Sequence, residues 1–268
     1  HCSFGKLTHL VLDEADRMLD MGFMPDIEAI TASLPKRRQS LLFSATLPPQ
    51  VERLAKKTLK DPVTIEVGDR SNPAETVKQF LYPVEQHLKA DLLKHLLEDH
   101  QFFSVIAFVR TREDAGNLAE ELHGAGISAE AIHSDRSQNH RTRTLRDFKA
   151  SKIRVLVATD IAARGIDIQQ LPMVVNFELP HVPEDYVHRI GRTARAGRSG
   201  IAYAFCDDTE SGYLVGIQQL IGQEIPVDSQ HEFHFIGAIP KPGQKPGKVK
   251  DSSGTKKRPR NNNSNNSR

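Results

Sequence analysis

Two acidic side chains follow a short apolar run near the start of the sequence. Residues 9–16 read His-Leu-Val-Leu-Asp-Glu-Ala-Asp, so Asp13 and Glu14 come directly after the run. In an open parallel sheet, ligands bind beyond the carboxyl ends of the strands, where these two acids would lie. In nucleotide hydrolases an acid at that place holds Mg²⁺ on the phosphates, and a neighbouring carboxylate orients the attacking water. Two solvated acids that open a turn are the alternative.

Two further apolar runs also end in polar side chains. Ser44 and Thr46 follow residues 41–43. Their hydroxyls suit hydrogen bonds relayed between sites, although such residues are also common in turns and caps. Residues 155–158 are followed by a group of polar side chains, namely Thr159, Asp160, Arg164 and Asp167. A helix that begins there could also receive a phosphate on its free amides.

A cluster of arginines surrounds residue 192. Residues 188–198 read His-Arg-Ile-Gly-Arg-Thr-Ala-Arg-Ala-Gly-Arg. Arg192 and Arg195 are three residues apart, so on a helix their guanidinium groups would share one face. The planar, permanently charged fork of arginine suits phosphate binding, and an arginine on a γ-phosphate stabilises the transition state of phosphoryl transfer. A solvated charged face is the alternative, which the glycines and the lack of interspersed acids make less favourable.

The elements that must position these residues alternate along the chain. Short β-branched runs are separated by amphipathic segments, and this alternation predicts an α/β fold of parallel sheets with helices on both faces. The expected strands are 7–12, 40–43, 63–67, 80–84, 105–109, 129–132, 155–158, 174–177 and 201–205. The expected helices are 25–34, 49–59, 88–99, 112–123, 138–149, 183–190 and 209–221.

The composition is that of a globular protein with a basic tail. Of the 268 residues, 38% are hydrophobic, and no apolar run reaches the about 18 residues of a membrane helix, which excludes a membrane protein. Residues 241–268 hold nine Lys and Arg against one acid, whereas residues 1–240 hold 27 against 33. This asymmetry predicts a polyanionic partner, with a merely solubilising tail as the alternative.

Cys2 and Cys206 cannot form a disulfide framework or a four-ligand zinc site, and we expect a cytoplasmic protein.

Taken in order, these motifs resemble the C-terminal part of a DEAD-box ATP-dependent RNA helicase. Residues 13–16 (Asp-Glu-Ala-Asp) match the motif that names the family. The other matches are Ser44 to Thr46 (the coupling motif), Ser104 to Phe108 (the first motif of the second domain) and, for the next three motifs, residues 133–141, 158–167 and 188–195. The resemblance covers about residues 1–225. Residues 17–23 and the basic tail look most like the bacterial RhlE-type branch.

The resemblance implies two RecA-like domains that bind ATP, Mg²⁺ and single-stranded RNA. By position, Asp13 would hold Mg²⁺ through water with Glu14 beside it, and Glu14 would act as general base on the hydrolytic water. The remaining nucleotide contacts implied are those of Arg192 and Arg195 with the phosphates, Asp167 near the ribose and Arg164 at the interface between the domains.

The resemblance also implies residues that couple the domains and residues that bind RNA. The coupling residues would be Asp16, Ser44, Thr46 and His188, and the residues along the RNA backbone would be Gln138, Arg141, Thr159 and Asp160. Gln138 and Arg141 are three apart on an expected helix, so both can face one phosphate track. Contacts to the backbone bind RNA without reading its sequence. The activity implied is the local separation of short RNA duplexes.

Three departures from the family pattern stand out. Ser134 and Ala194 replace usual glycines, which would distort the backbone only where a positive φ is needed, and we expect activity to survive both. The third departure is the phosphate-cradling pattern Gly-x-x-x-x-Gly-Lys-Ser/Thr, which does not occur in the 268 residues. We therefore expect this sequence, which begins at His1, to start inside a longer protein. We predict that the parent protein is an ATPase and that this chain alone is nearly inactive.

The same reasoning divides the chain into domains. We expect the C-terminal part of a first RecA-like domain at 1–67, a linker at 68–77, a second and complete RecA-like domain at 78–227, and a disordered basic tail at 237–268. Residues 1–67 should expose sheet edges and apolar faces, because the rest of their sheet is not in the sequence. Residues 75–236 should be the stable part.

An RNA-dependent ATPase and helicase is the leading hypothesis. It would act as a monomer on single strands and short duplexes of RNA, with ribosomal or RNA-decay assemblies as candidate partners. The first alternative is a truncated, non-catalytic RNA-binding protein that uses the second domain and the tail. The second alternative, a DNA-directed helicase of the same superfamily, is disfavoured by the Asp-Glu-Ala-Asp and His-Arg-Ile-Gly-Arg forms of the motifs.

The basic tail leads to a first testable prediction. Deleting residues 241–268 should weaken RNA affinity and flatten its dependence on salt, because fewer counterions are released when fewer cations contact phosphate. Fluorescence anisotropy over a series of salt concentrations measures both quantities. An unchanged salt slope would contradict a role of the tail in RNA binding.

Overall fold

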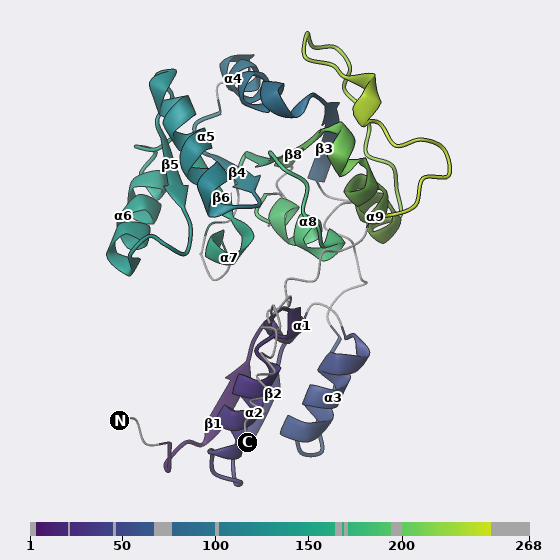
Figure 1. The fold of residues 1–268 in the computed structure, drawn as a ribbon. Coiled ribbons are helices and arrows are strands. Elements are labelled where there is room, and N and C mark those ends of the chain that lie inside the picture. The colour runs from purple at the N-terminus through teal and green to yellow at the C-terminus, as the bar shows by residue number, and fades with distance from the viewer. Residues whose placement is uncertain are drawn as a thin grey trace, which may run out of the picture. The chain divides into compact units, whose positions relative to one another are not determined.

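The chain divides into two compact units, one within residues 1–68 and the other within residues 69–250 (Figure 1). The computed structural model describes residues 4–20, 22–44, 47–66, 77–99, 102–163, 168, 171–193 and 200–247. In both units the strands pair in parallel and helices connect them, so the predicted α/β class with parallel sheets is confirmed. The described helices include none that is both long and apolar enough to cross a membrane.

The first unit packs three helices on a pair of parallel strands. Strands β1 (His9–Leu12) and β2 (Gln39–Leu42) are paired in register, with Leu12 opposite Leu42. The helices are α1 (Ala15–Asp20), α2 (Met24–Ala32) and α3 (Pro49–Thr58). Their apolar positions form a small core with the end of β1, whose buried members are Leu12, Ala15, Ile27, Val51 and Leu54.

Much apolar surface of the first unit faces solvent. Val11 and Phe43, on and just after the two strands, are more than half exposed, as the sequence predicts. The expected strand 63–67 is wrong for the described residues 63–66, which form no strand and leave Val63 and Ile65 exposed. A strand needs a hydrogen-bonding neighbour, and β1 and β2, the only strands described in this unit, pair with each other alone.

The second unit contains a six-stranded parallel sheet with the order β3-β8-β7-β4-β6-β5. The strands are β3 (Val77–Pro83), β4 (Val105–Val109), β5 (Ala129–Ile132), β6 (Val155–Thr159), β7 (Met173–Asn176) and β8 (Gly200–Cys206). All except β3 lie within about two residues of the expected bounds. Strand β3 begins at Val77, inside the expected linker, of which residues 68–76 lie outside the described part of the chain.

Helices cover both faces of this sheet. They are α4 (Lys89–Asp99), α5 (Arg112–Gly124), α6 (Gln138–Lys149), α7 (Asp160–Ala163), α8 (Pro183–Ile190) and α9 (Ser211–Ile221). Short 3₁₀ turns occur at Gln86–Leu88 (η2), Asp208–Glu210 (η3) and Ile236–Ala238 (η4). Side chains cap two of the helices, because the hydroxyl of Thr111 accepts the Asp114 N–H and that of Ser137 accepts the His140 N–H.

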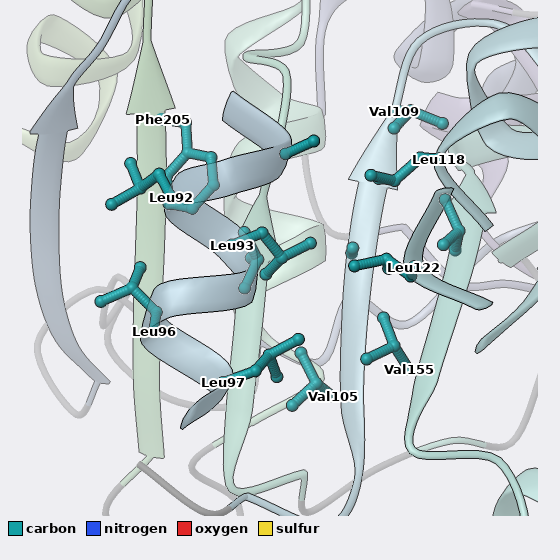
Figure 2. Packing of buried hydrophobic residues seen from close by; sticks show 14 of the residues in the cluster. Leu92, Leu93, Leu96, Leu97, Val105, Val109, Leu118, Leu122, Val155 and Phe205 are labelled. Atoms are coloured by element: carbon teal, nitrogen blue, oxygen red, sulfur yellow. The ribbon is translucent and has the colours of Figure 1, made fainter. Parts of the chain in front are cut away.

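Alternate residues of each strand enter different cores, as the period of two requires. Val105, Ala107 and Val109 of β4 pack with α4 and α5, whose leucines line this core in Figure 2. Ile106 and Phe108 of the same strand face the opposite side and pack with residues of α6 and α7. Helices α8 and α9 pack on that second side beside β3 and β8.

The chain after α9 returns along the edge strand β3. The Leu81 N–H donates to the Pro226 carbonyl, and the Asp228 N–H donates to the Leu81 carbonyl, both at 2.8 Å, so the edge is covered. The expectation of disorder from residue 237 is wrong for residues 237–247. Ala238 is buried, and the Gly247 N–H donates to the Gly212 carbonyl at 2.8 Å. The Cα of Gly247 lies 3.0 Å from where a side chain at Gly212 would begin, so this close packing requires glycine. The rest of the tail, 248–268, lies outside the described residues.

A buried ionic cluster joins η2 and α4 to the end of β8. The Lys89 Nζ lies 2.8 Å from the Asp207 carboxylate and 2.5 Å from that of Glu210, and all three side chains are buried. Burial alone would lower the pKa of Lys89, but the two carboxylates raise it. Burial also acts to raise the pKa of Asp207, yet Lys89 holds it below its usual value. Arg110 Nη2 lies 3.5 Å from Glu210 Oε1 as a more distant second cation, so Lys89 is the cation that the two carboxylates share.

Replacing Lys89 by methionine tests this dependence. The variant leaves Asp207 without its cation and Glu210 with only the more distant Arg110. Burial already raises the pKa of Glu210 to about 7, so without Lys89 the folded-state pKa values of both carboxylates should lie above the unfolded values. Stability is then lost as pH rises through the raised pKa values. We expect the free energy of unfolding at pH 7 to fall by about 3–5 kcal/mol, and the loss to shrink toward pH 4.

The measurement is urea unfolding followed by tyrosine fluorescence. All four tyrosines, at positions 82, 186, 203 and 213, belong to the second unit, and the chain has no tryptophan. Lys94→Met is the matched control, because Lys94 pairs with Asp91 and Glu121, which are half exposed, and its loss should cost less than about 1 kcal/mol. A loss in Lys89→Met that is the same at every pH would contradict the ionic role.

Candidate nucleotide and RNA site

The loop after β1 presents the two acids that the sequence singles out. Asp13 and Glu14 are exposed, and the Glu14 N–H donates to Asp13 Oδ1 at 2.9 Å. Glu14 has a φ of 51°, in the left-handed region. For a residue with a side chain this conformation costs about 1–3 kcal/mol, and such strain clusters at functional sites. The strained turn lies directly after β1 and leaves both acidic residues exposed.

The end of β2 holds this loop in place. The Ala15 N–H donates to the Phe43 carbonyl at 3.0 Å, and the Asp16 N–H donates to the Ser44 hydroxyl at 3.1 Å. These contacts form because β1 and β2 are parallel and in register, so that their carboxyl ends meet. The structure thus brings the backbone of Asp16 and the hydroxyl of Ser44 together within the first unit. Thr46 lies outside the described residues.

Arg17 is a member of this site that the motif reading missed. Its side chain is buried, and its Nη1 lies 3.4 Å from Glu14 Oε2. Its N–H donates to Asp16 Oδ1 at 3.1 Å. A cation that orients the glutamate could have been suspected from the sequence, because Arg17 follows Glu14 by three residues and a short helix places such residues on one side.

In the second unit, Gln138 and Arg141 lie together at the start of α6. Arg141 Nη1 donates to Gln138 Oε1 and Nη2 donates to the Ala162 carbonyl of α7, each at 3.3 Å. Gln138 is exposed and Arg141 is half-buried. The two side chains share one side of the helix, as their spacing predicts, and Arg141 links this side to the helix that follows β6.

Asp160, the first residue of α7, is held by a buried arginine of α8. Arg189 Nε and Nη2 donate to the two carboxylate oxygens of Asp160, each at 2.7 Å. The third nitrogen, Nη1, donates to Asn176 Oδ1 at 3.1 Å and to the Glu178 carbonyl at 2.6 Å. The guanidinium carbon lies 5.1 Å from the centre of the Phe108 ring. One side chain therefore ties together the ends of β4, β6 and β7.

Thr159 and Asp160, the two residues expected to contact RNA after β6, are both engaged within the second unit. The carboxylate of Asp160 is engaged by Arg189 on both oxygens, and Thr159 is buried as the last residue of β6. The geometry gives Asp160 a clear positioning role at the start of α7. Arg189, Asn176 and Glu178 were not singled out from the sequence, because their partners lie on other strands.

Helix α8 carries His188 but ends before Arg192. The last residue of the helix is Ile190, and Arg192 lies in the turn that follows Gly191. Its carbonyl accepts the Leu171 N–H at 3.1 Å. The expectation that Arg192 and Arg195 share a helical face is thus wrong for Arg192, because the chain leaves the helix to pair with residue 171. Arg195, Arg164 and Asp167 lie outside the described residues.

The serine that replaces a usual glycine is accommodated without strain. Among the described residues, the non-glycine residues with positive φ are Glu14, Asp61 and Ser151, and Ser134 is not one of them. A side chain at this position therefore meets no backbone penalty, in line with the expectation for it. Ala194, the other departure, lies outside the described residues.

The described residues also include an ion pair between the ends of β4 and β7. The guanidinium of Arg110 donates to Glu178 Oε1 from Nε at 3.0 Å and from Nη2 at 2.8 Å, and the backbone N–H of Arg110 donates to Glu178 Oε2 at 2.7 Å. No group of three or more His, Cys, Asp or Glu in the described part of the chain is placed to hold a metal ion. Asp13 and Glu14 still suit Mg²⁺, which is commonly bound by one or two carboxylates together with phosphates.

Each of the two units matches a helicase family model. Residues 1–54 match the DEAD/DEAH box helicase family, and residues 88–197 match the helicase conserved C-terminal domain. The DEAD-box ATP-dependent RNA helicase CshA of Bacillus cereus is 46% identical over 210 residues, which is 78% of this chain and 40% of the relative. CshA of Bacillus subtilis is 44% identical over 78% of this chain and 42% of its own length. The chain thus spans about two fifths of these relatives.

Solved structures agree with these matches. Yeast Dbp5 bound to RNA and ADP BeF3 aligns with 84% of this chain and 60% of its own, with a TM-score of 0.76 and 34% identity. The E. coli DEAD-box protein SrmB, bound to regulator of ribonuclease activity A, aligns with 64% of this chain and 98% of its own, with a TM-score of 0.56 and 35% identity. Fold and site thus define RecA-like helicase domains. The chain belongs to the DEAD-box ATP-dependent RNA helicase family.

The pair of Asp160 and Arg189 gives a prediction for this site. Asp160→Asn leaves a buried guanidinium without its counter-ion, so the free energy of unfolding of the second unit should fall by about 3–5 kcal/mol. Asp135→Asn is the matched control, because Asp135 pairs with Arg112 where both side chains are 58% exposed, and it should cost less than about 1 kcal/mol. Urea unfolding by tyrosine fluorescence measures both. Equal losses in the two variants would show that Arg189 needs no counter-ion.

Proposed function

We propose that the chain is the functional C-terminal part of an ATP-dependent RNA helicase, which couples ATP binding and hydrolysis to the local unwinding of short RNA duplexes and to RNA–protein remodelling. The observation that carries the proposal is the strained acid loop, in which Glu14 is left-handed and Asp16 is bound to Ser44. The named relatives are ATP-dependent RNA helicases, which favours the enzyme over a non-catalytic RNA-binding protein.

The acid loop suits the roles that the motif implies. Asp13 would hold Mg²⁺ through water and Glu14 would take the proton of the hydrolytic water, with Arg17 orienting its carboxylate. When bound with ATP, Mg²⁺ neutralises charge on the phosphates. From the second unit, Arg192 and Arg195 would bind phosphates, with Asp167 and Arg164 beside the nucleotide. Asp16, Ser44, Thr46 and His188 would couple the two domains, 1–67 and 78–227.

The RNA track would lie along the start of α6 and the end of β6. Gln138 and Arg141 are the residues whose polar atoms are best placed for it, because Gln138 is exposed and Arg141 connects α6 to α7. Thr159 and Asp160 would lie along the same track at the end of β6. Asp160 would act there through its ion pair with Arg189, which fixes the start of α7. Contacts of this kind are to the RNA backbone and do not depend on sequence.

Finer assignments rest on the sequence. Residues 17–23 and the basic composition of residues 241–268 support the RhlE-type branch. The share of each relative that the chain spans supports its being one part of a longer protein, and the phosphate-cradling loop absent from the 268 residues supports low activity of this part alone. We further propose a monomer in the cytoplasm that works with ribosomal or RNA-decay assemblies, supported by the scarcity of cysteine and by the basic tail.

RNA-stimulated ATP hydrolysis tests the proposal at Glu14. In the complete protein, Glu14→Gln should lower turnover by about 10²–10⁴-fold, because it removes a general base while keeping the shape of the side chain. Glu52→Gln, an exposed change on α3, is the matched control and should leave turnover unchanged. This chain by itself should show no turnover with either residue at position 14.

Two results would contradict parts of this account. Turnover by this chain alone that disappears in Glu14→Gln would support the base but refute the need for the missing loop. Turnover in the complete protein that survives Glu14→Gln would refute the role of Glu14.

A further inference from the structure

A run of net positive charge lies on and around α6. Residues 136–152 hold six Arg and Lys against one acid, Asp147, in a body where acids outnumber bases. The neighbouring helix α5 has the opposite balance, with four acids against one arginine over residues 112–124. The charge is therefore local to one helix, which packs beside β5, the edge strand at the opposite end of the sheet from β3 (Figure 1).

The two faces of α6 are sharply different. Thr144 and Phe148 are buried and face the core under the sheet. On the opposite face, the side chains of Arg143 and Arg146 are 77% and 71% exposed. Asp147, only 19% exposed, lies between them at 3.7 Å and 3.2 Å. The Asp147 carboxylate carries one negative charge and lies close to two guanidinium groups. It therefore orients both arginines but neutralises only one of their two positive charges.

The exposed arginines continue from the proposed RNA track. Gln138, Thr142 and Arg146 are each four residues apart, so they form one stripe along the helix, and the Thr142 hydroxyl donates to the Gln138 carbonyl at 2.9 Å. Asn139 and Arg143 form the next stripe. From Gln138 to Arg146 the surface extends roughly 12 Å along the helix axis. RNA that passes Gln138 can therefore follow a continuous polar surface.

The chemistry of this surface selects the form of RNA. Single strands are held largely by stacking of bases on aromatic side chains. The exposed residues of α6 include no Phe, Tyr or Trp, because Phe148 is buried, and the ring of the half-buried His140 lies 3.8 Å from Glu130. Double-stranded RNA is recognised by its shape through phosphates and 2′-hydroxyls, for which arginine and asparagine are suitable partners. Resting on the proposed function, we infer that Arg143 and Arg146, with Asn139, bind the duplex that flanks the single strand held at Gln138 and Arg141.

The test compares two RNAs by fluorescence anisotropy with this chain. One is a uridine single strand, and the other is a hairpin that carries the same strand as its overhang. Arg143→Gln/Arg146→Gln should weaken binding of the hairpin by on the order of tenfold at low salt and lower the slope of log K against log salt by about 2. Binding of the single strand should change by less than about twofold.

The control removes the same charge elsewhere. Lys36→Gln/Arg37→Gln takes two exposed cations from the turn before β2 and should leave the preference for the hairpin intact. Hairpin binding that is unchanged in Arg143→Gln/Arg146→Gln, or that falls no more than single-strand binding, would overturn the duplex surface.

A third variant separates this inference from the function on which it rests. Arg141→Gln should weaken both RNAs alike, because both contain the single strand. An unchanged affinity for both RNAs in Arg141→Gln would contradict the proposed track. A loss of hairpin binding confined to Arg143→Gln/Arg146→Gln, with Arg141→Gln acting on both RNAs, is the pattern expected when track and duplex surface both exist.

Discussion

The buried guanidinium of Arg189 is the contact on which the site of the second unit depends. Its three nitrogens donate four hydrogen bonds to Asp160, Asn176 and the Glu178 carbonyl, and its guanidinium carbon lies 5.1 Å from the centre of the Phe108 ring. A lysine has the charge but not the planar fork, so it could not reach all these partners. Because the partners lie at the ends of three strands, one side chain sets the position of α7 and α8 relative to the sheet.

Backbone strain plays the corresponding part in the first unit. Glu14 takes a left-handed conformation that a side chain disfavours, and the hydrogen bonds of Ala15 to Phe43 and of Asp16 to Ser44 hold it there. Any change that moves the end of β2 would therefore also move Asp13 and Glu14 after β1. The first unit has a small core and much exposed apolar surface. The two hydrogen bonds to Phe43 and Ser44 are therefore important for the conformation of the acid loop.

The two units differ in how they distribute charge. The second unit buries some of its ionic groups in pairs and clusters, as with Lys89, and places an excess of exposed cations over acids on α6. Buried pairs make the strand ends rigid, whereas exposed arginines remain available for phosphates. A polyanion can therefore be bound without disturbing the ion pairs that hold the sheet together.

The α/β class, most strand and helix bounds and the pairing of Gln138 with Arg141 could be predicted from the sequence, because they follow from local periodicity and spacing. The family came from the resemblance of the ordered motifs to those of DEAD-box helicases. Helices 138–149 and 183–190 and strands 105–109 and 129–132 have the expected bounds. Four findings come from the tertiary structure alone: residues 63–66 form no strand, Arg192 leaves its helix, residues 244–247 pack on α9, and Asp160 is bound by Arg189. Each of these depends on a partner far away in the chain, and no local pattern encodes whether such a partner is within reach.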